Sequence, residues 1–264
     1  TTVPHTPRRT TRPFLRLAMN PNPTPRLGGH ALIEALVAQG VSRVYGVPGE
    51  SYLAALDGLA SHADQIKFVV TRQEGGAAYM AEAEGKLTGR PGVCFVTRGP
   101  GATNACIGVH TAFQDSTPMV LLIGDVAQDA RDREAFQEVD FIAMFTPLAK
   151  RVERIDDAER IPEYVQRAFA TAMNGRPGPV VLVLPENMLT RPTTAQVLPR
   201  IEPVRAGANP NEVQATFTLL SKARKPLLIL GGGGWTADAA ADMRRFAQKW
   251  HIPVGCTFRF QDLF

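Results

Sequence analysis

Residues 93–123 read VCFVTRGPGATNACIGVHTAFQDSTPMVLLI, and this stretch decides the fold class. The run at 93–97 is short and almost continuously apolar, which is typical of a strand buried on both faces of a parallel sheet. A Gly-Pro-Gly turn then leads into a helix over 101–112, and a second apolar strand follows at 119–123. Because parallel neighbours need a crossover connection, usually a helix, the stretch predicts a strand–helix–strand unit.

The same alternation of short strands and helices extends in both directions. An i, i+4 apolar stripe predicts a helix over 29–39, which ends at Gly40. Further strands are expected at 43–47, 67–70 and 180–184, and further helices around 53–59 and at 75–87, 136–145 and 157–172. We therefore predict an α/β fold with a parallel sheet flanked by helices.

The chain of 264 residues divides into four predicted parts. Residues 1–26 are rich in Pro, Thr and Arg and carry no acidic residue, which favours a disordered leader, with a transit peptide as the alternative. Residues 27–189 form the first α/β domain, and the proline-rich residues 190–210 form a linker. Residues 211–264 hold only one strand–helix–strand unit, so we interpret them as the beginning of a second, doubly wound α/β domain that is truncated.

Composition and charge exclude several classes of protein. The formal net charge is +4, but the five arginines of residues 1–26 account for the excess, so no nucleic-acid-binding surface is predicted. No apolar run is long enough to span a bilayer, and residues 1–26 contain no apolar signal-peptide core, so no membrane association is predicted. The three cysteines form no CxxC motif, which favours reduced thiols in a cytoplasmic protein.

Three polar, glycine-rich segments each follow a predicted strand: GVPGE at 46–50, TRQEGGAA at 71–78 and TRGPGATN at 97–104. Open α/β sheets bind ligands at the carboxyl ends of their strands. Glu74 precedes a helix, so a helix cap is one interpretation of this carboxylate. The two glycines after it instead favour close approach by another molecule. The residues alone thus predict a pocket that contains a carboxylate, and they leave its ligand open.

The order of these segments resembles the thiamine-diphosphate-dependent enzymes of the acetolactate synthase and pyruvate oxidase superfamily. The arginine–histidine–glutamate stretch of that family corresponds to residues 72–74, and its GPGATN turn corresponds to residues 99–104. The runs FQDSTP at 113–118, AFQE at 135–138 and GRPGPV at 175–180 match as well. Several spaced motifs in the right order are a far more specific signal than one glycine-rich turn.

The resemblance implies a catalytic role for Glu74. In such enzymes the glutamate hydrogen-bonds N1′ of the cofactor's aminopyrimidine and favours the tautomer whose nitrogen removes the C2 proton of the thiazolium, so that a 2-oxo acid such as pyruvate is decarboxylated. By the same correspondence, the residues that bind thiamine diphosphate are Pro48, Gly49, Glu74, Thr97, Gly101 and Asn104.

The same correspondence places Phe113 and Gln114 near the substrate. A core aromatic and a helix end on the surface are the alternatives for these two residues. The sequence also departs from the family, because Gln73 replaces the histidine and Arg98 replaces a small residue. Arg98 could bind a substrate carboxylate, or be a solvent-facing charge or a subunit contact.

The family binds the diphosphate through Mg²⁺ held by a Gly-Asp-Gly motif, which this sequence lacks. The resemblance therefore implies that this chain supplies the pyrimidine-binding half, that the Mg²⁺ ligands lie in a C-terminal domain, and that the isolated fragment is inactive. Because the two halves meet across a subunit interface in the family, a homodimer or tetramer is expected. The four glycines at 231–234 leave FAD or ADP binding open, with a tight turn as the alternative.

We therefore predict the N-terminal part of a decarboxylase or carboligase of 2-oxo acids, most like acetolactate synthase. The alternatives are a related enzyme, namely an oxalyl-CoA decarboxylase, a benzoylformate decarboxylase or a pyruvate oxidase, or a non-catalytic scaffold that retains the fold. The carboxylate of Glu74 argues against the scaffold.

Overall fold

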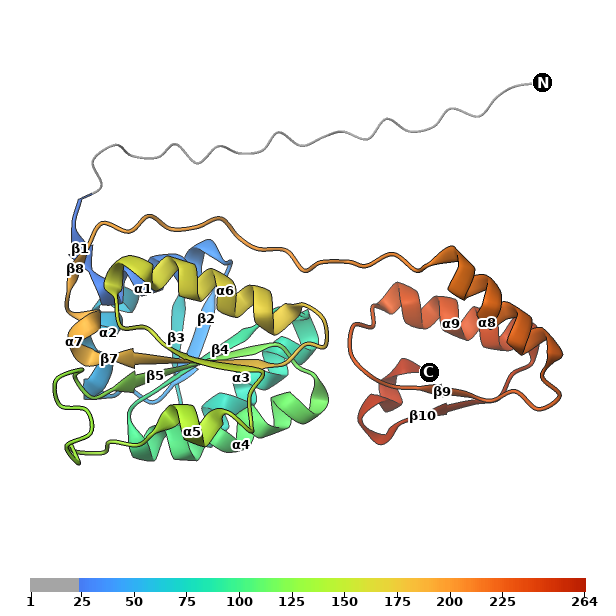
Figure 1. Ribbon diagram of the computed structural model, residues 1–264, viewed down its shortest axis with the longest axis horizontal. Coiled ribbons are helices and arrows are strands. Elements are labelled where there is room, and N and C mark those ends of the chain that lie inside the picture. Colours follow the sequence, from blue (N-terminus) through green and yellow to red (C-terminus); the bar gives the residue numbers. More distant parts are fainter. Residues whose placement is uncertain (1–23) are drawn as a thin grey trace, which may run out of the picture.

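The computed structural model describes residues 24–264 (Figure 1). The predicted leader lies outside these residues except for 24–26. The strands are β1 (Arg26–Leu27), β2 (Arg43–Gly46), β3 (Lys67–Val70), β4 (Gly92–Val96), β5 (Met119–Asp125), β6 (Arg151–Arg154), β7 (Pro179–Pro185), β8 (Pro192–Thr193), β9 (Leu228–Leu230) and β10 (Val254–Cys256). The α-helices are α1 (Gly28–Ala38), α2 (Leu53–Ser61), α3 (Glu74–Thr88), α4 (Gly99–Asp115), α5 (Phe141–Phe145), α6 (Ile161–Met173), α7 (Glu186–Leu189), α8 (Pro210–Lys222) and α9 (Ala237–Trp250). Short 3-10 helices lie at Glu50–Tyr52, Ala158–Arg160 and Phe258–Leu263.

The first domain is built on a parallel sheet of six strands in the order β3-β2-β4-β5-β7-β6. Helices α1, α2 and α6 enclose one apolar core against one face of the sheet, and α3, α4 and α5 enclose a second core against the other face (Figure 1). Every residue of β4, β5 and β7 is buried, because these central strands are covered on both sides. The predicted α/β fold with a parallel sheet flanked by helices is confirmed.

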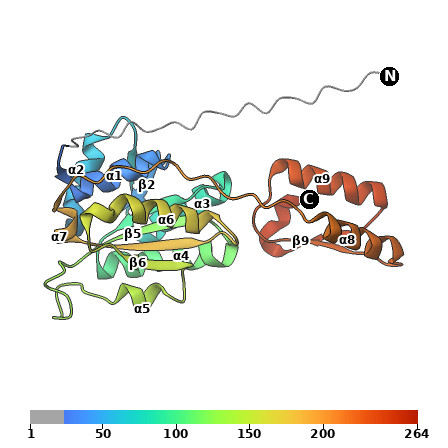
Figure 2. The same ribbon diagram turned by 45° about the horizontal axis from the view of Figure 1, so that its top comes forward.

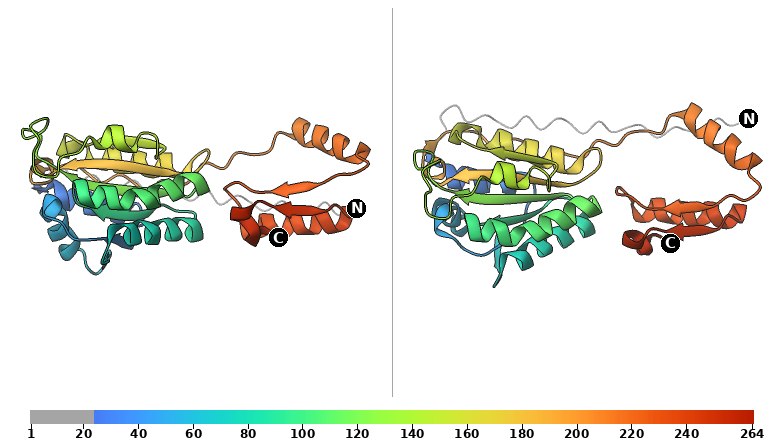
Figure 3. Two further views of the ribbon diagram at one scale, coloured as in Figure 1. Left: turned by 90° about the horizontal axis from the view of Figure 1, so that it is seen from below. Right: turned by 60° about the horizontal axis from the view of Figure 1, so that its bottom comes forward.

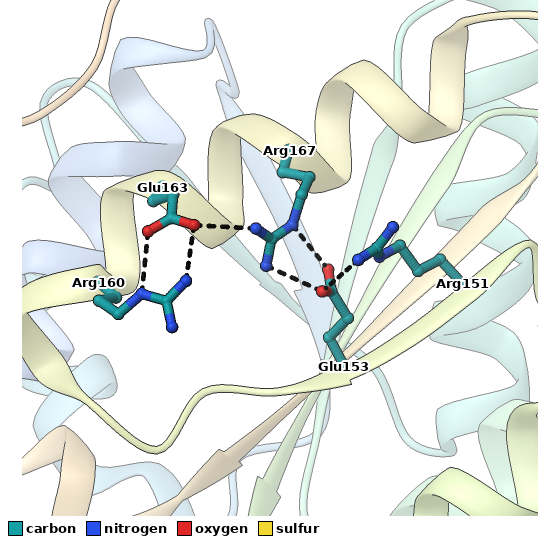
Figure 4. A network of polar contacts seen from close by, with 5 residues as sticks. All are labelled: Arg151, Glu153, Arg160, Glu163 and Arg167. Carbon is teal, nitrogen blue, oxygen red and sulfur yellow. Dashed lines mark hydrogen bonds and ion pairs between the residues drawn. The ribbon is translucent and has the colours of Figure 1, made fainter.

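Strand β6 forms one edge of this sheet, and the sequence prediction missed it. Its sequence RVER alternates charged and apolar residues, unlike the apolar runs of the central strands. Figure 4 shows that Arg151 and Glu153 of β6 join a network with Arg160, Glu163 and Arg167 of the preceding turn and α6. Burial alone raises the pKa of Glu153, but hydrogen bonds from Arg151 and Arg167 outweigh burial and lower it. Charged side chains on an edge strand disfavour pairing with another chain.

The long connection between β5 and α5 is irregular over residues 126–140, although a helix is predicted from 136. Three non-glycine residues of this loop have positive φ angles: Asp132 (62°), Glu134 (53°) and Gln137 (64°). Such angles end a helix, so α5 begins only after Asp140, whose side chain accepts a hydrogen bond from the N–H of Ala143 at 3.0 Å. Long loops without regular structure are uncommon inside a compact domain, and those that occur are usually functional or are linker segments.

The predicted linker at 190–210 is bound to the first domain over its first part. Strand β8 pairs with β1 in an antiparallel arrangement, with Arg26 opposite Thr193. Further along, the side chain of Gln39 donates to the carbonyl of Pro199 at 3.1 Å and accepts from the N–H of Ile201 at 3.0 Å. The extended segment then runs to α8, as Figures 1 and 2 show.

Residues from α8 onward form a smaller α/β unit (Figure 3). Strands β9 and β10 pair in parallel, with Leu228 opposite Val254, and α9 connects them. This confirms the predicted strand–helix–strand unit, while α8 was not predicted. Arg259 forms an ion pair of 2.6 Å with Asp115 at the end of α4, so the two units are in contact. Among residues 24–264, no helix is both long and apolar enough to cross a membrane.

Candidate functional site

The predicted site residues come from three connections at the carboxyl edge of the sheet. Pro48 and Gly49 follow β2, and Glu74 begins α3 after β3. Thr97 follows β4, and Gly101 lies in the first turn of α4. Strand β2 lies between β3 and β4, so these connections are neighbours in space as well as in topology. The order of the strands therefore explains why segments that are far apart in the sequence can build one site.

Glu74 is the first residue of α3, and it does not cap that helix. The cap is Gln73, whose Oε1 accepts a hydrogen bond from the N–H of Gly76 at 3.1 Å. Asn104 on α4 donates from Nδ2 to Oε2 of Glu74 at 2.9 Å. Within residues 24–264, no hydrogen bond reaches Oε1 of Glu74. The half-buried carboxylate is thus held through Oε2 and has Oε1 available for a ligand. Its place in the first turn of α3 also lets the helix dipole stabilise its negative charge.

Two glycines keep side-chain bulk out of this region. A Cβ atom built on Gly101 lies 3.0 Å from Cγ2 of Thr97 and 3.6 Å from Oε1 of Glu74. A Cβ atom built on Gly49 lies 2.4 Å from Cβ of Thr97, a separation that real side chains do not adopt. Glycine at 49 therefore lets the loop after β2 reach the end of β4, and glycine at 101 leaves the space beside the free oxygen of Glu74 open.

The loop after β2 is fixed by two contacts that the sequence analysis did not identify. The hydroxyls of Ser51 and Thr97 are 2.9 Å apart, and the phenol of Tyr52 donates to the carbonyl of Val47 at 2.5 Å. The ring of Tyr52 stacks on Phe95 of β4, with centroids 4.0 Å apart. Burial raises the pKa of Tyr52, so this residue remains a neutral donor. No local sequence pattern indicates the contacts to Thr97 and Phe95, because these two partners belong to a different part of the chain, β4 and the residue after it.

Phe113 and Gln114 lie near the carboxyl end of α4, nine and ten residues after Asn104. The rise of an α-helix places them about 14–15 Å from Asn104 along the axis. There the guanidinium of Arg176 lies 5.6 Å from the ring centroid of Phe113. Gln114 lines a cavity of about 280 Å³ between the first domain and the smaller α/β unit that begins at α8, called the central unit from here on. Within this chain, neither residue joins the group around Glu74.

Arg98, the residue between Thr97 and the Gly-Pro-Gly turn, is buried and is only 8% exposed. Its Nη2 lies 2.9 Å from Oε1 of Glu50 and 3.5 Å from Oε2 of Glu186. The interpretation of Arg98 as a solvent-facing charge is therefore wrong.

The described residues offer no metal centre. No group of three or more His, Cys, Asp or Glu side chains in residues 24–264 could hold a metal ion. Asp125, which follows Gly124 at the end of β5, already accepts a hydrogen bond from the N–H of Val126 at 2.9 Å and pairs with Arg154 at 3.4 Å. Burial raises the pKa of Asp125, against the opposing effects of Val126 and Arg154.

Both α/β units of the chain match known protein families. Residues 26–144 match the family model for the N-terminal TPP-binding domain of thiamine pyrophosphate enzymes, and residues 213–264 match the model for their central domain. The chain belongs to the thiamine pyrophosphate enzyme family. The order of the two matched domains agrees with the two α/β units of the structure, and the superfamily predicted from the motifs is confirmed.

Individual relatives narrow the similarity to acetolactate synthases. The chain is 36% identical over 239 residues to an acetolactate synthase of Arthrospira platensis, and 35% identical over 239 residues to the large subunit of acetolactate synthase isozyme 3 of Escherichia coli K12. It is 36% identical over 238 residues to a probable acetolactate synthase large subunit of Methanocaldococcus jannaschii. These matches cover 87% of this chain but only 40–41% of the relatives, so the chain spans about two fifths of their length.

The site geometry fits the aminopyrimidine end of thiamine diphosphate. The carboxyl group of Glu74 can form a hydrogen bond with a ring nitrogen through Oε1, since Asn104 binds Oε2. A flat ring needs space without side chains, and Gly101 leaves such space beside Oε1. For Mg²⁺, residues 24–264 offer no comparable group of His, Cys, Asp or Glu ligands.

Proposed function

We propose that this chain is the N-terminal part of a thiamine-diphosphate-dependent decarboxylase and carboligase of 2-oxo acids, most like acetolactate synthase. The observation that carries the proposal is the carboxylate of Glu74, held by Asn104 and open on the side of Gly101. The similarity to acetolactate synthases supports pyruvate as the substrate.

Each residue of the site has a separate task in this proposal. The bound cofactor supplies a thiazolium that accepts the electron pair released when carbon dioxide leaves. Glu74 shares a proton with N1′ of the aminopyrimidine, and Asn104 keeps the carboxylate in the orientation for that contact. Gly49 and Gly101 keep the ring space open. The Ser51–Thr97 hydroxyl pair and the Tyr52–Val47 hydrogen bond fix the loop that borders the ring.

We propose that the diphosphate and Mg²⁺ are bound by residues other than 24–264. The absence of a metal-binding group among these residues supports this division, as does the greater length of the relatives. The three cysteines are unpaired, which supports the further proposal of a reducing, cytoplasmic location.

Proton NMR of pyruvate incubated with the full-length protein, thiamine diphosphate and Mg²⁺ tests the function. The expected result is the appearance of acetolactate. If the protein binds the cofactor and leaves pyruvate unchanged, the substrate assignment is wrong. Benzoylformate, oxalyl-CoA and pyruvate with an electron acceptor then test the related lyases and the oxidase. Absence of any cofactor binding by the full-length protein would favour the scaffold.

We propose a homodimer that uses the outer face of α3 and α4. Tyr79 and Met80 of α3 and Ile107 of α4 are large apolar side chains that are 42–51% exposed. The hydroxyls of Tyr79 and Thr111 lie 3.5 Å apart, so the two helices present one continuous surface. An exposed apolar surface of this kind is typical of an interface between subunits.

Replacement of Ile107 by glutamate is expected to dissociate this dimer, because a charge in an apolar interface loses its hydration. Sedimentation of the full-length protein measures the result. Leu219→Glu on α8 is the matched control, since that leucine is also exposed but lies on the central unit. An unchanged dimer in Ile107→Glu would place the interface elsewhere.

We propose that the cavity between the two units takes the phosphate-bearing part of FAD. The cavity is lined by Gly232 and Gly233, and it also contains Arg176 and Arg259. Guanidinium groups and exposed backbone at glycines are suited to phosphate oxygens. The full-length protein is expected to retain the visible absorbance of a flavin after gel filtration, and Arg259→Met is expected to weaken that retention. A colourless protein that binds no added FAD would leave the glycines as a tight turn.

A further inference from the structure

Arg98 lies where four connections at the carboxyl edge of the sheet meet. It belongs to the short turn between β4 and α4, after Thr97 and directly before Gly99, the first residue of α4. Its guanidinium contacts Glu50 of the connection after β2 and Glu186 at the start of α7. Its Nη1 also donates to the carbonyl of Phe136 at 3.5 Å. One buried side chain thus joins the turn beside the cofactor site to three other segments.

The loop at 126–140, which extends at the left of Figure 1, contains Phe136, whose carbonyl accepts the hydrogen bond from Arg98. Backbone atoms hold it at a second point, because the N–H of Gly99 donates to the carbonyl of Gln137 at 2.9 Å. A Cβ atom on Gly99 would lie 2.9 Å from that same carbonyl oxygen and 3.3 Å from Cγ2 of Val139. The loop therefore rests directly on the Gly-Pro-Gly turn.

The internal shape of the loop does not depend on Arg98. The carboxylate of Glu138 accepts hydrogen bonds from the N–H groups of Asp132 at 2.6 Å and Ala135 at 2.9 Å. These bonds lower the pKa of Glu138, so it stays ionised near neutral pH.

The first part of the loop is attached to the domain without Arg98, because Gln128 and Arg131 each donate to Oδ1 of Asp156, at 3.0 and 3.1 Å. Arg98 contacts only the second part of the loop. Its tip exposes Phe136, which is 71% accessible.

The energetics favour a positioning role over a stabilising one. Glu50 and Glu186 have side chains that are 65% and 41% exposed, so water replaces Arg98 as their partner if the guanidinium is lost. Removing the arginine leaves no buried, uncompensated carboxylate. We expect the segment around Phe136 to lose one of its two attachments to the turn, while the backbone hydrogen bond from Gly99 to Gln137 and the fold are retained.

We propose that Arg98 is a positioning residue that holds the second part of the 126–140 loop against the turn before α4 and thereby fixes that turn, which leads to Gly101 and Asn104, beside Glu74. This inference rests on the proposed function for its catalytic consequence. The attachment itself can be measured without any activity.

Limited trypsin digestion of the full-length protein measures the attachment, because Arg133 is an exposed cleavage site inside the loop, whereas Arg131 is held by Asp156 at 3.1 Å. Arg98→Met is expected to be cut there at least about fivefold faster than the unmodified protein, since local opening controls proteolysis. Arg26→Met is the matched control. Arg26 also bridges a carboxylate, Glu34, and two carbonyls, but it lies on β1.

Glu50→Gln tests the path of the effect. If the guanidinium acts together with Glu50, this variant gives part of the acceleration, and the double variant is cut no faster than Arg98→Met alone. Equal cleavage rates in Arg98→Met and the unmodified protein would overturn the proposal. So would equal acceleration in Arg26→Met, because the effect would then be a general loss of stability.

Kinetics supply the second measurement. Arg98→Met is expected to lower kcat/KM by about tenfold, since a displaced turn moves Gly101 and Asn104 relative to Glu74. A faster-cut loop with unchanged KM and kcat overturns the role in catalysis. If the unmodified protein binds no cofactor, the proposed function fails, and the digestion result still decides whether Arg98 holds the loop.

Discussion

Replacing Glu74 with glutamine in the full-length enzyme is expected to slow acetolactate formation by about two powers of ten or more, because the general acid–base group is removed. Glutamine has the same shape, and its side-chain oxygen can still accept the hydrogen bond from Asn104, which the structure shows at 2.9 Å. It cannot share a proton with a ring nitrogen at neutral pH. The proton NMR assay with pyruvate measures the rate, and the thermal midpoint checks the fold.

Glu212→Gln is the matched control for this experiment. Glu212 also lies in the first turn of a helix, α8, but in the central unit, so the same chemical change is made far from the site. Its rate should equal that of the unmodified enzyme. A Glu74→Gln enzyme that works at full rate would remove Glu74 from the mechanism and with it the observation that carries the proposed function.

Replacing Gly49 with alanine is expected to reduce turnover by about a hundredfold, because a displacement of about 1 Å at a reacting group has effects of this size. The new Cβ atom would lie 2.4 Å from Cβ and 2.7 Å from Oγ1 of Thr97. The loop must move away from β4, and the Ser51–Thr97 hydrogen bond of 2.9 Å is lost or lengthened. The backbone angles of Gly49, φ −139° and ψ 152°, suit alanine, so the effect is one of space.

Gly76→Ala is the control for Gly49→Ala. It lies on α3 two residues after Glu74, and a Cβ atom there meets nothing within 4 Å. Alanine in a helix is favoured over glycine by about 1 kcal/mol, so this variant should be as stable as the unmodified protein or more so. Titration calorimetry with thiamine diphosphate and Mg²⁺ should show weaker binding for Gly49→Ala alone. Equal affinities would show that the loop after β2 does not border the cofactor.

The candidate site illustrates which features could be predicted from local sequence. The local pattern predicts a carboxylate, Glu74, at the carboxyl edge of the sheet, whereas Gly101 and Asn104 were assigned through the resemblance to the family. The structure brings the three residues together because β2 lies between β3 and β4. The placement of Phe113 and Gln114 needed the length of α4, which separates them from Asn104. That they belong to a substrate site stays a prediction, since within this chain they line a different cavity or contact Arg176.

The buried strands and the helices that cross over between them were determined by the sequence itself. Runs such as those of β4 and β5 are apolar on both faces, and that pattern has few other stable solutions in a soluble chain. Strand β6 carries no such pattern, because an edge strand needs an apolar side chain only on its covered face. Its identity depended on pairing with β7 and on the ion pairs with α6.

The roles of Arg98 and Tyr52 were decided only by the tertiary structure. The sequence places each residue near a glycine-rich turn, but it does not show that Arg98 meets Glu50 and Glu186 or that Tyr52 stacks on Phe95. Those partners come from separate elements of the fold, and their approach is fixed by sheet order and helix packing. Short-range periodicity reports which face of an element is buried, whereas a contact between elements is a property of the assembled fold.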